Sequence, residues 1–117
     1  MEQRKRAYLK GHLAEWVARA LLCMKGYRIL AARHRTPFGE IDIVAKRGTM
    51  IVGVEVKKRT SQILAQETLA AQGSDRMGRA LSFYLTRHRQ YATHNTRLDG
   101  ICVGAWFIPR HFQNIGL

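Results

Sequence analysis

Two stretches of alternating polar and apolar residues, 40–46 and 50–58, constrain the fold of this chain most strongly. In the second stretch, Val52, Val54 and Val56 recur at every other position, which is the period of a β-strand with one buried face. The short connection contains Arg47-Gly48, and glycine accepts the positive φ that a tight turn requires. The pattern therefore predicts an antiparallel β-hairpin.

The predicted hairpin gathers acidic side chains on one face. With Arg47-Gly48 as the turn, Asp42 lies opposite Gly53 and Glu40 lies opposite Glu55, and directly opposite residues share a face of the sheet. Gly53 would then leave space in front of Asp42. A register shifted by two residues keeps the same faces and sets Asp42 opposite Glu55, whereas a shift of one residue separates them.

Lys57 falls one step beyond these carboxylates on the same face. Opposed like charges destabilise paired strands, so three neighbouring carboxylates favour a compensating cation. Carboxylate oxygens suit Mg²⁺ or Mn²⁺, and a lysine beside such an ion can offset charge that grows on a phosphate. Taken alone, Glu55-Val56-Lys57 is also typical of a solvated strand face. Glu40 and Asp42 at the matching parity favour the metal site.

The charge balance of the chain points to a polyanionic partner. Lys and Arg number 20 against 8 Asp and Glu, which gives a formal net charge of +12. So large an excess costs self-repulsion that a polyanion would relieve, and nucleic acid is the commonest such partner. An acidic membrane surface or an acidic protein would also satisfy the charge. Because no apolar run approaches the ~18 residues that span a bilayer, and the N-terminal region lacks a signal-peptide pattern, we expect a cytoplasmic protein without a membrane partner.

The remaining sequence surrounds the hairpin with helices and further strands. The predicted elements are a helix over 4–25, a strand over 27–32, a loop over 33–39, a weaker helix over 61–72, a helix from Ser74 and a last strand over 98–108 that Pro109 ends. This order predicts a single α/β domain, 1–117, with a mixed central sheet flanked by helices.

Several other residues receive an expected environment from the sequence. Trp16 and Trp106 are expected in the core, and Cys23 and Cys102 as buried free thiols, the common state of free cysteine. The histidines show no metal-ligand spacing with one another, so solvated or nucleic-acid-facing roles are expected for His34, His88, His94 and His111.

The hairpin motif resembles a known family. Gly39-Glu40-Ile41-Asp42, followed by a hairpin into Val54-Glu55-Val56-Lys57 and a basic residue, resembles the bacterial YraN-like uncharacterised family. That family belongs to the restriction-endonuclease-like superfamily, whose PD-(D/E)XK nuclease core is shared by archaeal-type Holliday junction resolvases. The likeness extends to Gly11, Glu15, Ala18, the stretch 26–30, Arg35 and, more loosely, Arg97-Leu98-Asp99.

The resemblance implies a restriction-endonuclease-like fold and a Mg²⁺-dependent nuclease that acts on DNA, with structured or branched DNA as the expected substrate. Asp42 and Glu55 fall on the metal-binding acids of the superfamily, and Lys57 falls on its catalytic lysine. Glu40 matches the family's own extra acid. Glu15 resembles the helical glutamate that resolvase-like members bring to the metal, although its place off the apolar stripe of the helix leaves a solvated role open.

Two further implications concern partners. Resolvase-like members tend to act as dimers, so a homodimer is expected. The superfamily also contains members that bind without cutting, so the alternative is a nucleic-acid-binding protein without catalysis. Candidate phosphate contacts are basic residues on the expected loops and helices, although a charged run is also typical of a solvated face: Arg33, Arg35, Lys58, Arg59, Arg76, Arg79, Arg87 and Arg89.

Overall fold

The structure is a computed structural model that describes residues 2–58 and 74–115. Five strands form one sheet in the order β1-β2-β3-β4-β5. All neighbouring strands are antiparallel except β3 and β4, which run parallel. The elements are α1 (Glu2–Met24), β1 (Arg28–Thr36), β2 (Gly39–Arg47), β3 (Met50–Lys58), α3 (Ser74–Thr86), η1 (Arg89–Tyr91), β4 (Asn95–Val103), η2 (Ala105–Phe107) and β5 (Pro109–Phe112).

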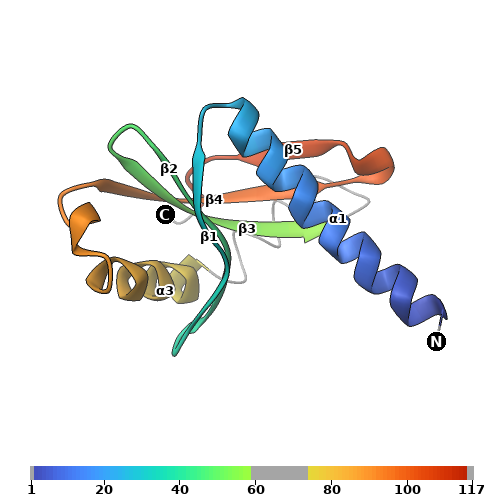
Figure 1. Cartoon of the computed structure of the whole chain (residues 1–117), viewed down its shortest axis with the longest axis horizontal. Helices are drawn as coiled ribbons and strands as arrows, with labels where there is room; N and C mark the ends of the chain where they lie inside the picture. The colour runs from blue at the N-terminus through green and yellow to red at the C-terminus, as the bar shows by residue number, and fades with distance from the viewer. Residues whose placement is uncertain (1, 59–73, 116–117) are drawn as a thin grey trace.

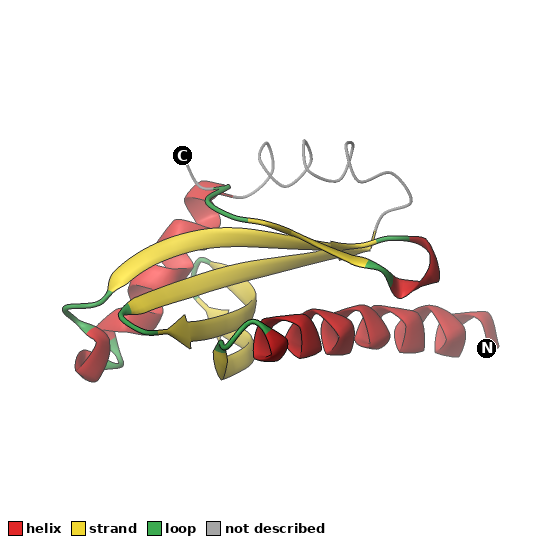
Figure 2. Cartoon of the chain, turned by 90° about the horizontal axis from the view of Figure 1, so that it is seen from above, coloured by secondary structure: helices red, strands yellow, loops and turns green. Residues whose placement is uncertain are grey.

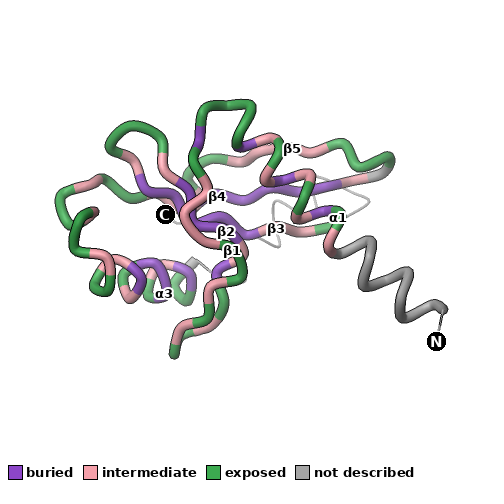
Figure 3. Tube along the Cα trace, viewed as in Figure 1, coloured by how far each residue is buried: buried purple, intermediate pink, exposed green. Residues whose placement is uncertain are grey.

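The two described α-helices pack on opposite faces of the sheet (Figures 1 and 2). Alternate residues of β3 divide between two hydrophobic clusters: Val52 and Val54 pack with α1, and Ile51 packs with α3. The buried segments follow the central strands in Figure 3. The predicted α/β architecture, a mixed sheet flanked by helices, is confirmed. The sheet has one strand more than expected, β5.

Helix α1 buries a narrower face than its sequence suggests. Ala14, Ala18 and Leu22, spaced four apart, are buried against the sheet. Trp16 is instead 61% exposed, and Met24 also faces outward, so the prediction of Trp16 in the core is wrong. Two overlapping apolar arcs run along this helix, and the arc with small side chains is the one that lets the helix approach the strands closely.

The segment expected as a loop, 33–39, largely continues strand β1. The strand runs to Thr36, and β2 begins at Gly39, so only two residues remain for the turn. The Thr36 hydroxyl closes this turn, because it donates to the carbonyl of Gly39 at 2.7 Å and accepts the amide of Phe38 at 3.1 Å. Pro37 lies in the turn itself, where its missing N–H removes no ladder hydrogen bond.

The C-terminal hairpin also differs from the prediction. Strand β4 ends at Val103, and Pro109 begins β5 instead of ending the previous strand. A proline is tolerated as the first residue of a strand, where no donor is needed. Trp106 lies between these strands and is 92% exposed, so its predicted core position is wrong as well.

A buried polar network joins β4 to β5 and to the start of β1. The fully buried Asp99 accepts two hydrogen bonds from Arg97, at 2.8 Å each, and one from the His111 ring at 2.7 Å. Arg97 also donates to the Tyr27 hydroxyl, and the amide of Asn114 donates to Asp99. The expected solvated role of His111 is therefore wrong, since its side chain is 2% exposed.

Other expectations have mixed outcomes. Cys102 is buried as predicted, but Cys23 is exposed at the end of α1. The helix predicted from Ser74 is confirmed as α3. The helix predicted over 61–72 and the basic residue Arg59 lie outside the described residues. Within the described part of the chain, no helix has the length and apolar content to cross a membrane.

Candidate functional site

The hairpin of β2 and β3 has the predicted faces but a register shifted by two residues. Arg47 pairs with Met50 and Val44 pairs with Gly53, so the turn residues are Gly48 and Thr49. Continued past the last pair, Ile43 with Val54, this register sets Asp42 opposite Glu55. The acids therefore stay on one face, as the alternation predicted.

The predicted role of Gly53 is wrong. Because Gly53 pairs with Val44, it does not leave space in front of Asp42. A methyl group at Gly53 would lie 3.3 Å from a side-chain carbon of Leu98 and 3.5 Å from one of Leu81. The missing side chain makes room for α3 and β4 to pack on the hairpin, and an ion does not use that space.

A cleft of about 320 Å³ opens where β2 and β3 separate. The Asp42 carboxylate accepts a hydrogen bond from the amide of Val56 at 2.8 Å, beyond the end of the backbone ladder between these strands. The cleft brings together three of the four predicted acids with the predicted lysine and one arginine. Its lining residues are Glu40, Ile41, Asp42, Glu55, Val56, Lys57, Arg76 and Met77.

Asp42 is unfavourably ionised in this cleft. Burial raises its pKa to about 6, the Val56 hydrogen bond opposes that rise, and the charges of three glutamates add to it. Those glutamates are Glu55, Glu15 and Glu40. Because the ionised form of this carboxyl group is disfavoured, a nearby cation would stabilise it.

Glu55 and Lys57 form a close pair on β3. Lys57 Nζ lies 3.0 Å from Glu55 Oε1, and the side chain of Glu55 is mostly buried. The other carboxylate oxygen, Glu55 Oε2, is buried and has no hydrogen-bond partner. A buried carboxylate oxygen without a partner costs free energy, and a positively charged group beside it would lower that cost.

Glu15 is near the cleft but does not line it. Its carboxylate binds Arg33 Nε at 2.7 Å and lies 3.9 Å from Arg19, so α1 and β1 are joined at this point. Arg33 also contacts His12 and adopts a φ of 52°, which is unusual for a residue other than glycine. The ion pair with Glu15 occupies an arginine that the sequence predicted as a phosphate contact.

Glu40 lies at the rim of the cleft. Its side chain is 40% exposed, and Arg35 approaches it at 3.7 Å with a side chain that is almost wholly in solvent. Within the described residues, no three side chains of His, Cys, Asp or Glu are arranged closely enough to hold a metal ion as they stand.

Helix α3 brings basic side chains to the cleft. Arg76 packs across Gly39, where an added methyl group would lie 3.0 Å from its Cδ. Gly39 also has a φ of 127°, so both its conformation and its lack of a side chain keep Arg76 at the cleft. Arg79 is one turn further along α3 and lines a neighbouring groove.

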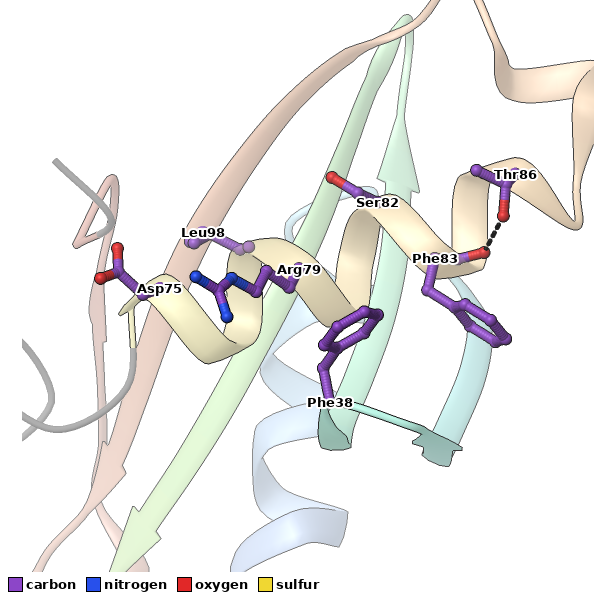
Figure 4. Close-up of a pocket in the computed structure, with 8 residues that line it drawn as sticks. Phe38, Asp75, Arg79, Ser82, Phe83, Thr86 and Leu98 are labelled. Atoms are coloured by element: carbon purple, nitrogen blue, oxygen red, sulfur yellow. Dashed lines mark hydrogen bonds between the residues drawn. The ribbon is translucent and has the colours of Figure 1, made fainter.

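That groove of about 870 Å³ follows the outer side of α3 (Figure 4). Phe38, from the turn between β1 and β2, and Phe83 on α3 contact edge to face at 6.4 Å between ring centroids. Arg79 lies between them and Asp75 along the helix (Figure 4). The two predicted arginines, Arg76 and Arg79, thus form one basic edge that runs from the cleft into the groove, because residues three apart are neighbours on a helix.

Arg87 also joins this edge, because its guanidinium lies over the ring of Phe83 at 5.1 Å from the centroid, whereas other predicted basic residues lie elsewhere. Arg35 is exposed at the β1–β2 hairpin, and Lys58 ends β3 near the ring of Phe107, at 6.0 Å from its centroid.

Sequence reasoning missed the buried network around Asp99. An aspartate next to Gly100-Ile101-Cys102-Val103 is its one local signal, because an acid inside a buried strand needs a partner.

The comparisons with known proteins point to one family over most of the chain. The model of the uncharacterised protein family UPF0102 matches residues 14–103. A UPF0102 protein of Mesorhizobium japonicum is 45% identical over 95% of this chain and 89% of its own length. UPF0102 proteins of Chelativorans sp. (strain BNC1) and Rhizobium etli (strain CIAT 652) are 43% and 42% identical, over 96% and 95% of this chain and 90% and 91% of their own lengths. By both the family match and these relatives, the chain belongs to the uncharacterised protein family UPF0102, the YraN-like family.

Proposed function

We propose that this protein is a metal-dependent nuclease that hydrolyses phosphodiester bonds in DNA. The observation that carries the proposal is the cleft in which a desolvated Asp42 and a buried, unpartnered oxygen of Glu55 lie beside Lys57 and Arg76. Two acids of this kind with a lysine on the same strand face also match the nuclease motif that the sequence resembles.

Asp42 and Glu55 are the residues that would hold Mg²⁺ or Mn²⁺, because burial and neighbouring acids disfavour the charge of Asp42 and Glu55 Oε2 has no hydrogen-bond partner. Bound there, the ion would supply Lewis acidity toward a phosphodiester. Glu40, at the rim, adds negative charge that strengthens attraction for a cation. Glu15 acts on Asp42 through its charge and is held back from the cleft by Arg33.

The cations of the cleft act on the substrate. Lys57 is positioned by Glu55 at 3.0 Å, so its charge is available where negative charge grows on a reacting phosphate. Arg76 faces the same cleft from α3, and its planar guanidinium suits two oxygens of one phosphate. DNA, and structured or branched DNA in particular, is the proposed substrate because the motif resembles that of junction resolvases.

Cleavage assays test this proposal directly. Purified protein is incubated with Mn²⁺ or Mg²⁺ and a panel of duplex, single-stranded and four-way-junction DNAs. We expect cleavage of at least one substrate, with losses of 100-fold or more in Asp42→Asn, Glu55→Gln and Lys57→Ala, the scale of losing a transition-state contact. Thr93→Ala, at an exposed residue in the turn before β4 that lines neither the cleft nor the groove, is the control and should cleave normally.

A second readout separates metal binding from catalysis. Calorimetric titration with Mn²⁺ should give a binding signal for the wild type that is lost in Asp42→Asn and kept in Thr93→Ala. Absence of cleavage on every DNA, or cleavage that survives both Asp42→Asn and Glu55→Gln, would reject the enzyme.

The second candidate is a nucleic-acid-binding protein that does not cut. The observation that favours it is the lack, among the described residues, of three preassembled metal-ligating side chains. This candidate predicts salt-sensitive binding that persists in EDTA and after Lys57→Ala, because displaced counterions drive the association and a metal ion does not.

A further inference from the structure

The turn between β4 and β5 lies at one end of the sheet (Figure 1), and three of its apolar side chains are exposed to solvent. Trp106 is 92% exposed, Ile108 is 57% exposed and Phe107 is 39% exposed. Burial of one large aromatic side chain ordinarily contributes a substantial share of the stability of a small core. This chain instead holds a tryptophan at the tip of a hairpin, where folding does not bury it.

The backbone of this turn is strained. Trp106 and Phe107 have φ values of 61° and 56°, and two consecutive left-handed residues that are not glycine are uncommon. Hydrogen bonds from the Gly104 amide to the Ile108 carbonyl, at 3.1 Å, and from the Phe107 amide to the Gly104 carbonyl, at 3.2 Å, hold the conformation. Backbone strain of this kind clusters at binding and active sites, where the surrounding structure holds it and it preorganises side chains for a ligand.

The turn follows β4, the neighbour of β3, and it contacts α1, whereas the cleft opens on the α3 side of the sheet. Strands β3 and β4 run parallel, and Lys57 pairs with Cys102 while Lys58 pairs with Val103, the last residue before the turn. Trp106 is four residues past Cys102, so at about 3.3 Å per residue it lies within about 13 Å of Cys102 and, with about 5 Å between neighbouring strands, within about 18 Å of Lys57. A polymer would therefore reach this tip if it leaves the cleft around the end of β3.

The surroundings of the tip are basic. The Lys58 ammonium lies 6.0 Å from the ring centroid of Phe107. Arg110 follows the turn on β5 and pairs with Cys102, so Arg110 and Lys57 share a face two strands apart, about 10 Å from each other. An exposed ring with cations around it fits a partner that combines flat apolar groups with regularly spaced negative charges, which is the chemistry of a nucleic acid with an exposed base.

We propose that Trp106 stacks on an unpaired nucleobase of the nucleic acid that occupies the cleft. Lys58 and Arg110 would contact the phosphates on either side of that base. The inference rests on the proposed function for its nucleic-acid partner, and it narrows the substrate to one with unpaired bases next to the site of cleavage. Stacking on aromatic rings tolerates any base, so no sequence preference is required.

Binding measured in EDTA tests the inference without cleavage. The probes are a single-stranded oligothymidine and a fully paired duplex of equal length. Trp106→Ala should weaken single-strand binding about 5- to 150-fold, the equivalent of one base–aromatic stack, and should change duplex binding much less. Trp106→Phe should retain most of the affinity. Trp16→Ala is the matched control and should bind as the wild type, since Trp16 is a second exposed tryptophan on α1.

Fluorescence identifies the partner of the tip. In a Trp16→Phe chain, all tryptophan emission comes from Trp106, because the chain has two tryptophans. We expect quenching by the single strand and no blue shift with phosphatidylglycerol vesicles. A blue shift with vesicles and no response to the single strand would reject the inference in favour of a lipid surface. Self-association in sedimentation that Trp106→Ala abolishes would reject it in favour of a second copy.

Single-strand binding that is unaffected by Trp106→Ala, or lost equally for both probes, also overturns the stack. These failures are distinct from failure of the nuclease. A wild type that cuts no DNA but shows Trp106-dependent binding would uphold the stack and reject catalysis. Cleavage that depends on Asp42, together with single-strand binding that Trp106→Ala leaves unchanged, would uphold catalysis and reject the stack.

Discussion

Asp42 accepts a hydrogen bond from the amide of Val56, which favours its ionised form. The charges of three nearby glutamates disfavour that form. Burial raises its pKa to about 6 from an ordinary value of 3.8. The folded protein therefore holds the proton of Asp42 more tightly than the unfolded chain does. An acid with a raised pKa lowers stability as the pH rises from its unfolded pKa to its folded one.

Replacement of Asp42 by asparagine should stabilise the metal-free protein at neutral pH. The amide oxygen still accepts the Val56 hydrogen bond, and the unfavourable charge is gone. At pH 7 we expect Asp42→Asn to raise the free energy of unfolding by about 3 kcal/mol, an order of magnitude set by the pKa shift. Urea denaturation in EDTA measures it.

The pH profile is the control for this prediction. The advantage of Asp42→Asn should develop as the pH rises between about 4 and about 6, the interval between the two pKa values, and should be absent at pH 4. An equal advantage at both ends of this interval would show that packing, and not charge, distinguishes the two proteins.

Sequence reasoning predicted the shared face of Asp42, Glu55 and Lys57 because alternation alone decides which face a strand residue takes. It did not predict the register, since that depends on whether Gly48 enters the turn as its first or second residue. Trp16 was misassigned for a different reason. Both arcs of α1 are apolar, and periodicity does not tell which arc the sheet will meet.

At the scale of elements, the network around Asp99 joins β4, β5 and the start of β1 in the absence of any sequence pattern that links them. Arg97 and Asp99 share a face of β4 by alternation, but Tyr27 and His111 are brought to them only by the folded sheet. Burial opposes ionisation of Asp99, but the hydrogen bonds from His111, Arg97 and the Asn114 amide outweigh it and lower its pKa. The ionised form is therefore part of the folded state.

Asp99→Asn should destabilise the protein strongly. The substitution leaves the mostly buried Arg97 without its counter-charge, and breaking a buried pair in this way costs about 3–5 kcal/mol. Thermal or urea unfolding measures the loss. Asp75→Asn, at an exposed acid in the first turn of α3, should cost under about 1 kcal/mol.

Wild-type stability should also depend on Asp99 at low pH. Because the folded pKa lies below the ordinary value of 3.8, the contribution of Asp99 is complete above that pH and is lost as the pH falls below it. The difference in stability between the wild type and Asp99→Asn should therefore shrink below pH 4. A difference that is constant down to pH 2 would contradict the ion pair as its cause.

Gly53 and Gly78 test how α3 meets the sheet. Val at position 53 would push against Leu98 and Leu81, which already lie 3.3 and 3.5 Å from the nearest added carbon. We expect Gly53→Val to cost about 1–3 kcal/mol of unfolding free energy. Gly78→Ala is the opposite case, since its added carbon meets Leu98 at an ordinary 3.8 Å and alanine favours the helix by about 0.5–1 kcal/mol. Equal losses in both variants would indicate that α3 tolerates no change on this side.

At the scale of the whole molecule, part of the net charge of +12 is concentrated along one edge of the protein. Arg76 and Arg79 lie along the edge of α3 that leads from the carboxylate cleft into the groove beside Phe38. Arg28 is the first residue of β1, and the opposite end of β1 leads into the turn that carries Phe38. Arg28 lies seven residues from Arg35, which is next to that turn, so the two are at most about 23 Å apart along the strand. The total charge predicts that DNA binds, and the positions of these arginines predict where.

Salt titration distinguishes DNA binding at these arginines from DNA binding that depends only on the total charge. Each lysine or arginine that neutralises a phosphate adds about one unit to the slope of log affinity against log salt concentration. Arg76→Ala and Arg79→Ala should each lower the slope for duplex DNA by about one, whereas Arg28→Ala removes the same charge far from the cleft and should leave the slope nearly unchanged. Fluorescence anisotropy between 50 and 200 mM salt, about the range in which phosphate contacts dominate, measures all three. Equal effects from the three variants would mean that DNA responds to the net charge alone and that the edge of α3 is not its path across the protein.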